Sequence, residues 1–319
     1  MIVTLTLNPS LDRTFVIERL ARGELHRATQ TWTDPAGKGV NVAKALHANG
    51  VETLAVLPIG GASGSELLRL LEMTGIPSQP VSIGGAVRAN VSVVEADGTV
   101  TKLNEPGPRL TAAEIEILVS TALKAPSPGG WLVASGSLPV GAPPDTYASI
   151  TERAEAAGVR FALDSSGAAL AIAVAARPTL IKPNLEELRE LTGEPLHTLG
   201  DVTRAMERLV ANGVPEVLVS LGPQGAVLSS NGHLLHGMAS VYEVRNTVGA
   251  GDALLAGYVA GGDDPATALA TGLAWARNGI RTPGTSASAS DAADLAAVSI
   301  KDRIDQDLQL EQELNRVGS

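Results

Sequence analysis

The chain enters a helix through Asn246-Thr247-Val248-Gly249-Ala250-Gly251-Asp252, and the apolar residues Ala253-Leu254-Leu255-Ala256-Gly257 follow at once. Two glycines around one alanine permit a tight turn, and the apolar run predicts a buried helix. The first N–H groups of a helix have no partner inside it, so here they point at whatever lies before the turn. With the helix dipole they form an anion hole, which suits the charge on a transferring phosphoryl group.

Asp252 stands at the mouth of this turn. A carboxylate in that place can accept the proton of an attacking hydroxyl, as a general base does. Asp is also a common N-cap residue, which would make Asp252 a structural feature of its own helix. The spacing alone leaves both interpretations open.

Outward from this turn, short apolar or β-branched runs alternate with stretches of helical length. The predicted strands are Thr53–Pro58, Trp131–Ser135, Arg160–Asp164, Leu180–Lys182 and Glu216–Ser220, and the chain is expected to start on a strand as well. The predicted helices are Val42–Asn49, Gly64–Thr74, Ala112–Lys124, Tyr147–Ala157, Leu185–Thr192, Val202–Asn212 and Ala253–Ala260. This alternation predicts an α/β fold with a parallel sheet that is covered on both faces.

Two stretches break the alternation and read as hairpins. Arg13–Glu18 pairs with Arg27–Thr33, and Val87–Glu95 pairs with Thr99–Asn104 across a turn at Asp97-Gly98. They could form a small antiparallel sheet apart from the main one, and in a kinase-like protein such a sheet would be a lid that excludes water. The alternative is that they are edge strands of the main sheet.

The composition sets broad limits. Of 319 residues, 44% are apolar and 18% are charged, which predicts a globular protein with one large core or two unequal ones. The absence of cysteine excludes a disulfide framework, a thiolate metal site and a catalytic thiol.

The charge and the N-terminus bear on partners and location. A formal net charge of −10 argues against a nucleic-acid or membrane-surface partner, although a local basic pocket stays possible. No apolar run approaches the roughly 20 residues of a membrane span, and the N-terminus lacks the pattern of a signal peptide. We therefore expect a cytoplasmic protein.

A second glycine turn, in Asp34-Pro35-Ala36-Gly37-Lys38-Gly39-Val40-Asn41, also leads into a predicted helix. It is not a Walker loop, because Gly39 follows Lys38 where a Ser or Thr would stand. A turn with a lysine and an amide suits a polyhydroxylated or phosphorylated ligand. The glycines near Gly60–Gly64 lack the spacing of a dinucleotide fingerprint.

The two glycine turns, taken as a pair, resemble the signatures of the ribokinase-like PfkB sugar kinases. Further segments agree with that family, in the family's order and over about residues 1 to 300: Asn8-Pro9-Ser10-Leu11-Asp12, Arg88-Ala89-Asn90, Asn104-Glu105-Pro106-Gly107-Pro108, Ser135-Gly136-Ser137, Lys182-Pro183-Asn184-Leu185-Glu186-Glu187 and Ser220-Leu221-Gly222-Pro223-Gln224-Gly225. The first and third of these resemble the branch of the family that acts on phosphosugars. The resemblance implies a Rossmann-like core with a β-sheet lid.

The resemblance also implies roles for individual residues. Asp252 becomes the general base, and the backbone of Gly249, Ala250 and Gly251 the anion hole. The residues that hold the sugar are expected to be Asp12, Gly37, Lys38, Gly39 and Asn41, with Ser137 nearby. Arg88 is expected to pair with the phosphate already on the substrate, and Arg27 and Lys102 are weaker phosphate candidates that could equally be solvated surface residues.

On the nucleotide side, the residues expected to lie along ATP are Lys182, Asn184, Ser220, Leu221, Gly222, Pro223, Gln224 and Gly225. Asn184 and Glu187 match an element that organises Mg²⁺ through its waters; without the family, an ordinary helix start after Pro183 would be the simpler interpretation. A monovalent cation near Arg281–Thr285 is a further candidate.

The expected reaction is ATP-dependent phosphorylation of a ketohexose phosphate, with fructose 1-phosphate as the first choice of substrate. Tagatose 6-phosphate and fructose 6-phosphate are alternatives within the family, as is a nucleoside or ribose kinase. A non-catalytic phosphosugar-binding protein is the alternative outside it.

The organisation of the chain follows from the same pattern. We expect one domain over residues 1–300, with lid strands from about 12–34 and 87–104, and a homodimer in which a partner lid covers the lid sheet. The polar tail, 301–319, could hold a weakly amphipathic helix over Lys301–Val317, although a tail without function is the favoured interpretation.

Overall fold

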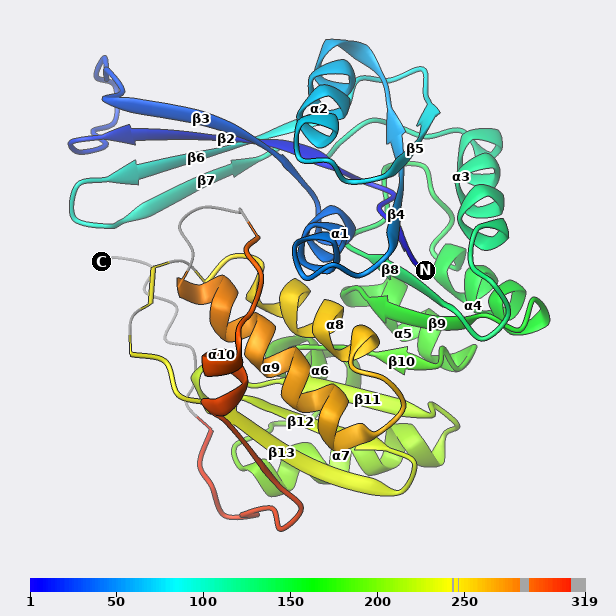
Figure 1. Cartoon of the computed structure of the whole chain (residues 1–319). Helices are drawn as coiled ribbons and strands as arrows, with labels where there is room; N and C mark the ends of the chain where they lie inside the picture. The colour runs from blue at the N-terminus through cyan, green and yellow to red at the C-terminus, as the bar shows by residue number, and fades with distance from the viewer. Residues whose placement is uncertain (243, 246, 282–286, 311–319) are drawn as a thin grey trace.

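The structure is a computed structural model that describes residues 1–310 except 243, 246 and 282–286. Asn246, most of the segment expected to hold a monovalent cation, and residues 311–319 of the tail lie outside the described residues. Figure 1 shows a body of strands and helices from which a second sheet projects to one side.

The main sheet is mostly parallel. Within the described ranges it has ten strands in the order β14-β13-β12-β11-β10-β9-β8-β1-β4-β5. Pairing is parallel from β11 through β5 and antiparallel from β11 through β14. The strand bounds are β1 (Ile2–Leu5), β4 (Thr53–Ile59), β5 (Ser78–Ser82), β8 (Trp131–Ser135), β9 (Arg160–Asp164), β10 (Leu180–Ile181), β11 (Glu216–Ser220), β12 (Ala226–Ser230), β13 (His233–Ala239) and β14 (Val298–Lys301).

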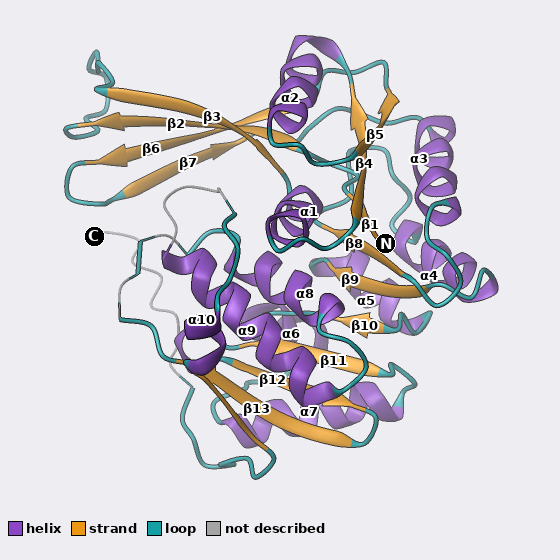
Figure 2. Cartoon of the chain, in the orientation of Figure 1, coloured by secondary structure: helices purple, strands orange, loops and turns teal. Residues whose placement is uncertain are grey.

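Helices cover both faces of this sheet, as predicted (Figure 2). One face packs against α3 (Ala112–Lys124), α4 (Thr146–Ala156), α5 (Gly167–Ala175), α6 (Leu185–Thr192) and α7 (Leu199–Ala211). The other packs against α1 (Lys38–Ala48), α8 (Ala250–Ala260) and α9 (Pro265–Arg281); α2 (Gly61–Met73) lies near the lid, and α10 (Ala292–Ala296) beside α9. Successive residues of β8 alternate between the two cores, because side chains of a strand point to opposite faces: Trp131 and Val133 enter one, Leu132 and Ala134 the other.

The two predicted hairpins form a separate sheet, so the alternative that they are edge strands of the main sheet is wrong. Its order is β3-β2-β6-β7, with β2 (Ser10–Ile17), β3 (Gln30–Ala36), β6 (Arg88–Glu95) and β7 (Val100–Asn104). We call these four strands the lid. Each hairpin is antiparallel, and Gly98 turns the second with φ +89°, but the central β2 and β6 pair in parallel, which the sequence did not indicate.

Two of the predicted helices, those that follow the glycine turns, begin too late in the chain. Helix α1 begins at Lys38 rather than Val42, and α8 at Ala250 rather than Ala253. The predictions started each helix at its apolar run, whereas the first turn is made of the glycine-rich residues themselves. The candidate residues after Gly37 and Gly249 are therefore part of the helices, and these two glycines are the N-caps.

Several elements were missed by the sequence analysis, among them α5, α9 and the hairpin of β12 and β13. This hairpin turns at Asn231-Gly232, where both residues have positive φ. Asn-Gly between two apolar runs is a strong hairpin signal, so the turn could have been found.

The described part of the predicted tail helix is not helical, so that hypothesis is wrong over residues 301–310. The segment extends β14 and then crosses the start of α7, where the backbone N–H groups of Leu199 and Gly200 donate to the carbonyl oxygens of Leu308 and Gln306. These two helix N–H groups have no intrahelical partner, so the segment caps α7. Leu310 is buried in the main core. We propose that the domain extends at least to Leu310, beyond the boundary expected at residue 300.

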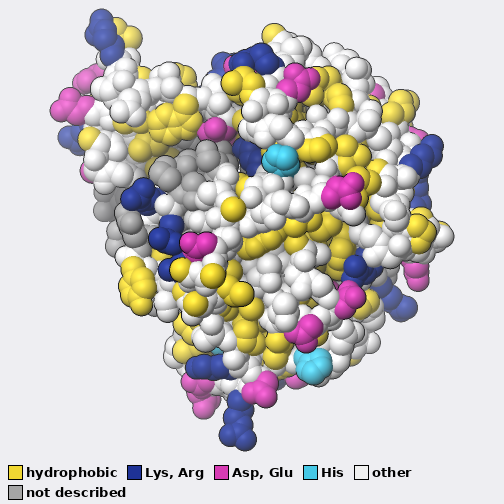
Figure 3. Space-filling view, in the orientation of Figure 1, with side chains coloured by type: hydrophobic (Ala, Val, Ile, Leu, Met, Phe, Trp, Pro, Cys, Tyr) yellow, Lys and Arg dark blue, Asp and Glu magenta, His cyan; other side chains and the backbone are white. Residues whose placement is uncertain are grey.

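No helix in the described parts of the chain has both the length and the apolar character that a bilayer crossing requires. On the face that Figure 3 shows, Lys and Arg side chains are dispersed among acidic and uncharged ones.

Replacement of Leu310 by alanine tests whether this segment belongs to the core. We expect Leu310→Ala to lower the free energy of unfolding by about 3 kcal/mol, because a buried leucine leaves a cavity. Leu25, which is 79% exposed, is the matched control, and Leu25→Ala should stay within ~0.5 kcal/mol of the parent. Urea unfolding measures both, and equal stabilities of the two variants would contradict a structural role for Leu310.

Candidate active site

The predicted site residues converge beyond the carboxyl ends of the parallel strands. Asp164 ends β9, Lys182 follows β10, and Ser137 lies just after β8. In open parallel sheets this edge is where ligands bind. Residues from the starts of α1 and α8 reach the same edge.

Asp252 is held by an amide from the first turn of α1. Its Oδ2 accepts a hydrogen bond from Asn41 Nδ2 at 2.8 Å, and the residue is 6% exposed. Burial, and then the nearby Asp164 carboxylate, raise the pKa of Asp252 to about 7. A carboxyl group with this pKa can accept a proton near neutral pH.

The alternative role of Asp252 as an N-cap is wrong. The N-cap of α8 is Gly249, in the left-handed conformation with φ +84°, and no side chain caps the helix. Asp252 lies three residues further on, in the first turn of α8. Its side chain therefore does not cap the first N–H groups of this helix.

The glycines at the start of α1 allow the helix to approach β1 closely. A Cβ on Gly39 would lie 2.4 Å from Thr6 Oγ1 and 3.0 Å from the carbonyl oxygen of Leu5. Gly37 has φ +123°, which disfavours any other residue. Because α1 and α8 pack against each other on one face of the sheet, Asn41 reaches Asp252.

Asp164 holds two lysines together. Its Oδ1 lies 2.8 Å from Lys38 Nζ and its Oδ2 lies 2.8 Å from Lys182 Nζ, while the carboxylate side chain is 1% exposed. Burial alone would raise the pKa of Asp164, but Lys182 and Lys38 outweigh it and lower that pKa. Lys182 Nζ also lies 3.4 Å from the position that a Cβ on Gly251 would occupy. Positive charge thus faces the glycine turn of α8.

Three asparagines around the site share one pattern, in which the amide NH₂ binds a protein group and the amide oxygen stays free. Asn41 donates to Asp252, Asn90 to Asp12 and Ser10 at 3.0 Å each, and Asn8 to the carbonyl oxygen of Pro106 at 3.1 Å. Within the described residues, the Oδ1 atoms of all three asparagines are buried and have no hydrogen-bond partner. Buried acceptors without partners call for a ligand or water, and sugar hydroxyls are suitable donors.

Arg88 connects the lid to the body. Its guanidinium donates to the carbonyl oxygens of Asn8 at 3.0 Å and Glu105 at 3.1 Å, and its buried Nε has no partner among the described residues. With the Gly107 loop it lines a cavity of about 400 Å³. In this conformation two guanidinium nitrogens serve the backbone, so only part of the group is available for a substrate phosphate.

The nucleotide-side residues form one continuous edge. Asn184 and Ser220 are joined by a parallel bridge between the ends of β10 and β11, and Gly222–Gln224 forms a single 3₁₀ turn before β12. Gly225 has φ +83°, and a Cβ there would lie 1.9 Å from the carbonyl oxygen of Gly237. The loop is therefore held close to β13 by a position that only glycine fits.

Asn184 and Glu187 are a helix start as well as a candidate metal element. Asn184 Oδ1 accepts from Glu187 N at 2.8 Å, and Glu187 Oε2 accepts from Asn184 N at 2.9 Å, which is a capping box. The other oxygen, Glu187 Oε1, lies 3.6 Å from Lys38 Nζ. The structural interpretation is thus confirmed, and one carboxylate oxygen still faces the site.

This donor set fits magnesium held mainly by phosphates. The described residues contain no group of three acidic, His or Cys side chains that could hold a metal alone. Mg²⁺ commonly binds through one or two carboxylates with waters and substrate phosphates, and Glu187 supplies such a carboxylate.

The sequence analysis missed Asn8, Asn90, Ser10 and Asp164 as individual site residues, although the first three lay inside quoted motifs. Asp164 carried no motif signal, since its importance comes from two lysines that are distant in sequence. The weaker candidates are both exposed: Arg27 lies in the loop between β2 and β3, and Lys102 lies on β7 of the lid.

Comparisons with known proteins identify the family of this chain. The family model of pfkB family carbohydrate kinases matches residues 5–292. A 1-phosphofructokinase of Xanthomonas campestris pv. campestris is 38% identical over 274 residues, which cover 84% of this chain and 86% of that protein. An ATP-dependent 6-phosphofructokinase isozyme 2 of Mycobacterium tuberculosis is 34% identical over 292 residues, with coverage of 90% and 86%.

A similar solved structure is phosphofructokinase-2 from Escherichia coli in complex with potassium. It has a TM-score of 0.87 and 32% identity, and the match covers 92% of this chain and 96% of that one. Because the family model matches most of the chain and a curated relative is 38% identical over 84% of it, the chain belongs to the pfkB family of carbohydrate kinases.

Proposed function

We propose that this protein transfers the γ-phosphoryl group of ATP to fructose 1-phosphate and forms fructose 1,6-bisphosphate. The observation that carries the proposal is the buried Asp252 carboxyl group, held by Asn41 beside the glycine turn of α8. Relatives named 1-phosphofructokinase, at 38% and 35% identity, support the choice of substrate.

In the proposed reaction, Asp252 accepts the proton of the sugar hydroxyl as its oxygen attacks the γ-phosphorus. The bond from that phosphorus to the bridging oxygen breaks, and ADP leaves with the electron pair. The N–H groups at Gly249, Ala250 and Gly251 stabilise the negative charge on the transferring group. Positioning and charge neutralisation supply most of the catalysis in such reactions.

Lys38 and Lys182 flank this path. Burial opposes the charge of Lys38, but Asp164 and Glu187 outweigh it and raise the pKa of Lys38, so its ammonium stays charged at neutral pH. We propose that Asp164 fixes both ammonium groups where the γ-phosphate moves between donor and acceptor. Both ammonium groups would thereby be held where they can attract the phosphates, although the carboxylates of Glu187 and Asp252 also act on Lys38.

We propose that the free Asn8, Asn41 and Asn90 oxygens, with Asp12 and Ser137, accept or donate to the sugar hydroxyls. Arg88 would bind the substrate phosphate through its unpaired Nε and by releasing a backbone carbonyl. The proposed ATP site runs along Lys182, Asn184 and the loop Ser220–Gly225.

Bound Mg²⁺ would neutralise the nucleotide phosphates. We propose that Glu187 holds one of its waters while Asn184 keeps the carboxylate oriented. A monovalent cation is also part of the proposal, supported by the potassium complex of the Escherichia coli relative.

We further propose a cytoplasmic homodimer formed through the lids. Strand register places Phe15 beside Val93, and Val91 beside Leu103, on the lid face opposite Asp12 and Asn90. Leu103 is 62% exposed. An apolar face on a thin, projecting sheet is a surface that a second copy of the lid would cover.

A 6-phosphofructokinase is the second candidate. The Mycobacterium tuberculosis relative, which matches 90% of this chain, favours it. Tagatose 6-phosphate kinase and a non-catalytic phosphosugar-binding protein are the remaining alternatives from the sequence.

A substrate panel separates these candidates. Steady-state ADP release with fructose 1-phosphate, fructose 6-phosphate, tagatose 6-phosphate, unphosphorylated fructose and adenosine should give the highest kcat/KM for fructose 1-phosphate. Loss of an ion-paired phosphate should lower kcat/KM for fructose by at least about tenfold. A preference for fructose 6-phosphate would favour the second candidate, and binding without turnover would favour the non-catalytic one.

Asp252→Asn tests the general base and keeps a side-chain oxygen that can accept the hydrogen bond from Asn41. We expect kcat to fall by about 10²–10⁴, because the variant cannot accept the proton. The dissociation constant for the phosphosugar, measured by calorimetry, should change little. Turnover at the rate of the parent enzyme would rule out the assigned base.

The pKa of Asp252 provides a further test, in which two substitutions should shift the pH profile in opposite directions. A base must be ionised, so kcat/KM should fall as the pH drops through about 7. Asp164→Asn removes a negative charge that raises this pKa and should move the acid limb below that value. Asn41→Ala removes a hydrogen bond that favours the ionised form and should move the limb above it. Shifts in the same direction in both variants would contradict the assignment of the limb to Asp252.

A further inference from the structure

Lys44 is a buried lysine that the proposed reaction does not use. It lies one turn after Asn41 on α1 and is 7% exposed. Its ammonium donates a hydrogen bond to the carbonyl oxygen of Pro35. Pro35 belongs to β3, an edge strand of the lid, so the contact joins helix α1 to the root of the lid.

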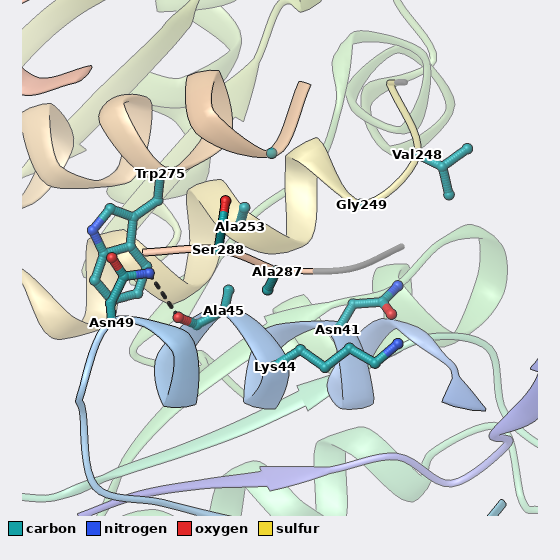
Figure 4. Close-up of a pocket in the computed structure, with 11 residues that line it drawn as sticks. Asn41, Lys44, Ala45, Asn49, Val248, Gly249, Ala253, Trp275, Ala287 and Ser288 are labelled. Atoms are coloured by element: carbon teal, nitrogen blue, oxygen red, sulfur yellow. Dashed lines mark hydrogen bonds between the residues drawn. The ribbon is translucent and has the colours of Figure 1, made fainter. Parts of the chain in front are cut away.

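Figure 4 shows the Lys44 and Asn41 side chains extending from α1 in the same direction, beside a cavity. The cavity is lined also by Trp275 and Ser288, and its volume of about 40 Å³ admits roughly three water molecules. The Lys44 ammonium reaches the carbonyl oxygen of Pro35, which is not among the residues that line this cavity.

The charges that act on Lys44 come from three elements. They are Asp34 on β3, Asp12 on β2 and Asp252 on α8. The remaining strands that pack on α1, namely β1, β4 and β8, have no titratable side chain, and α1 itself contributes Lys38 near its start and His47 near its end. A single buried ammonium thus stands among three carboxylates on the sugar side of the site.

This balance matters because the substrate in the proposed function is an anion. Three carboxylates near a phosphosugar repel it, and the repulsion is strong where water is excluded. A positive charge at Lys44 offsets part of that repulsion. The same ammonium holds the lid strand that carries Asp34.

We propose that Lys44 is a positioning residue whose buried ammonium ties the root of the lid to α1 and offsets the Asp12, Asp34 and Asp252 charges, so that an anionic sugar can bind. This inference rests on the proposed function for its second part. The first part, the tie to the lid, is independent of the reaction.

The protonation state of Lys44 should make kcat/KM depend on pH. Burial lowers the pKa of Lys44 to about 8, although the three carboxylates oppose this shift. The ammonium is the functional form, so kcat/KM for the phosphosugar should fall as the pH rises through about 8. The chain has no cysteine, so no thiol titrates in this range.

Two substitutions separate charge from shape. Lys44→Met keeps the length of the side chain without charge, and Lys44→Arg keeps the charge at all accessible pH values. The adjacent cavity gives the larger guanidinium room. The control is Lys124→Met at the exposed end of α3, which removes one positive charge far from the site.

The first measurement is the pH dependence of kcat/KM for fructose 1-phosphate. In Lys44→Met we expect the alkaline limb to vanish and KM for the sugar to rise about tenfold to a hundredfold at pH 7.5, with KM for ATP within twofold. In Lys44→Arg the limb should also vanish, but KM should stay within about threefold of the parent. Lys124→Met should keep the parent profile. An alkaline limb that persists in Lys44→Met, or an unchanged KM for the sugar, would overturn the proposal.

The second measurement needs no substrate. Amide hydrogen exchange in β3, Gln30–Ala36, should be faster in Lys44→Met than in the parent and in Lys44→Arg, while β11, Glu216–Ser220, stays unchanged. Equal exchange in β3 across the variants would refute the tie. If the parent enzyme turns over no sugar in the panel, the proposed function is wrong, and the exchange measurement still tests whether Lys44 holds β3 to α1. If turnover occurs without an alkaline limb, only the proposed role of Lys44 is wrong.

Discussion

A buried carboxylate, Asp164, is the interaction on which the arrangement of the site depends. It pairs with Lys38 from the start of α1 and Lys182 from the end of β10, each at 2.8 Å. Removal of either partner from such a group would leave a charge in a dry environment, which is strongly unfavourable. The pairing therefore fixes the proposed sugar side and the proposed nucleotide side of the site relative to one another. The glycine turn of α8 lies against Lys182, through Gly251.

The proposed site has to bind anions although the molecule as a whole is negatively charged. The chain has a net charge of −10, and its proposed ligands are anions. In the proposed function two lysines, an arginine and the N-terminus of α8 bind the phosphates locally, and no basic surface is needed. The same principle applies beneath the proposed sugar site, where the Lys44 ammonium stands among three carboxylates. Local charge placement in a region of low water content outweighs the average over the surface.

Much of the fold could be predicted from local sequence. The bounds of β8, β9, β11, α3 and α6 agree with their predictions, since each has a clear apolar pattern or capping residues. The late starts predicted for α1 and α8 arose because glycines have low helix propensity and yet form the first turns there. Over residues 301–310 the predicted tail helix is wrong, because Ile304, Leu308 and Leu310 pack on the core from an irregular segment with a turn. An apolar residue every few positions does not distinguish such a segment from a helix. Strands β12 and β13 were missed despite their Asn-Gly turn.

The sequence by itself determined the α/β class, the two hairpins of the lid, both glycine turns and the identity of the residues around them. These features depend on residues that are neighbours in the chain, so propensity and spacing are sufficient. Tertiary structure alone decided the Asn41–Asp252 contact, the Asp164 bridge and the burial of Lys44. The first two of these join side chains that are 211 and 126 residues apart in the chain. The pKa values of Asp252, Asp164 and Lys44 depend on how far water is removed from each side chain. Only the packed sheet and helices bring these charges together and dehydrate them, which is why the chemistry of the site could not be obtained from the order of residues alone.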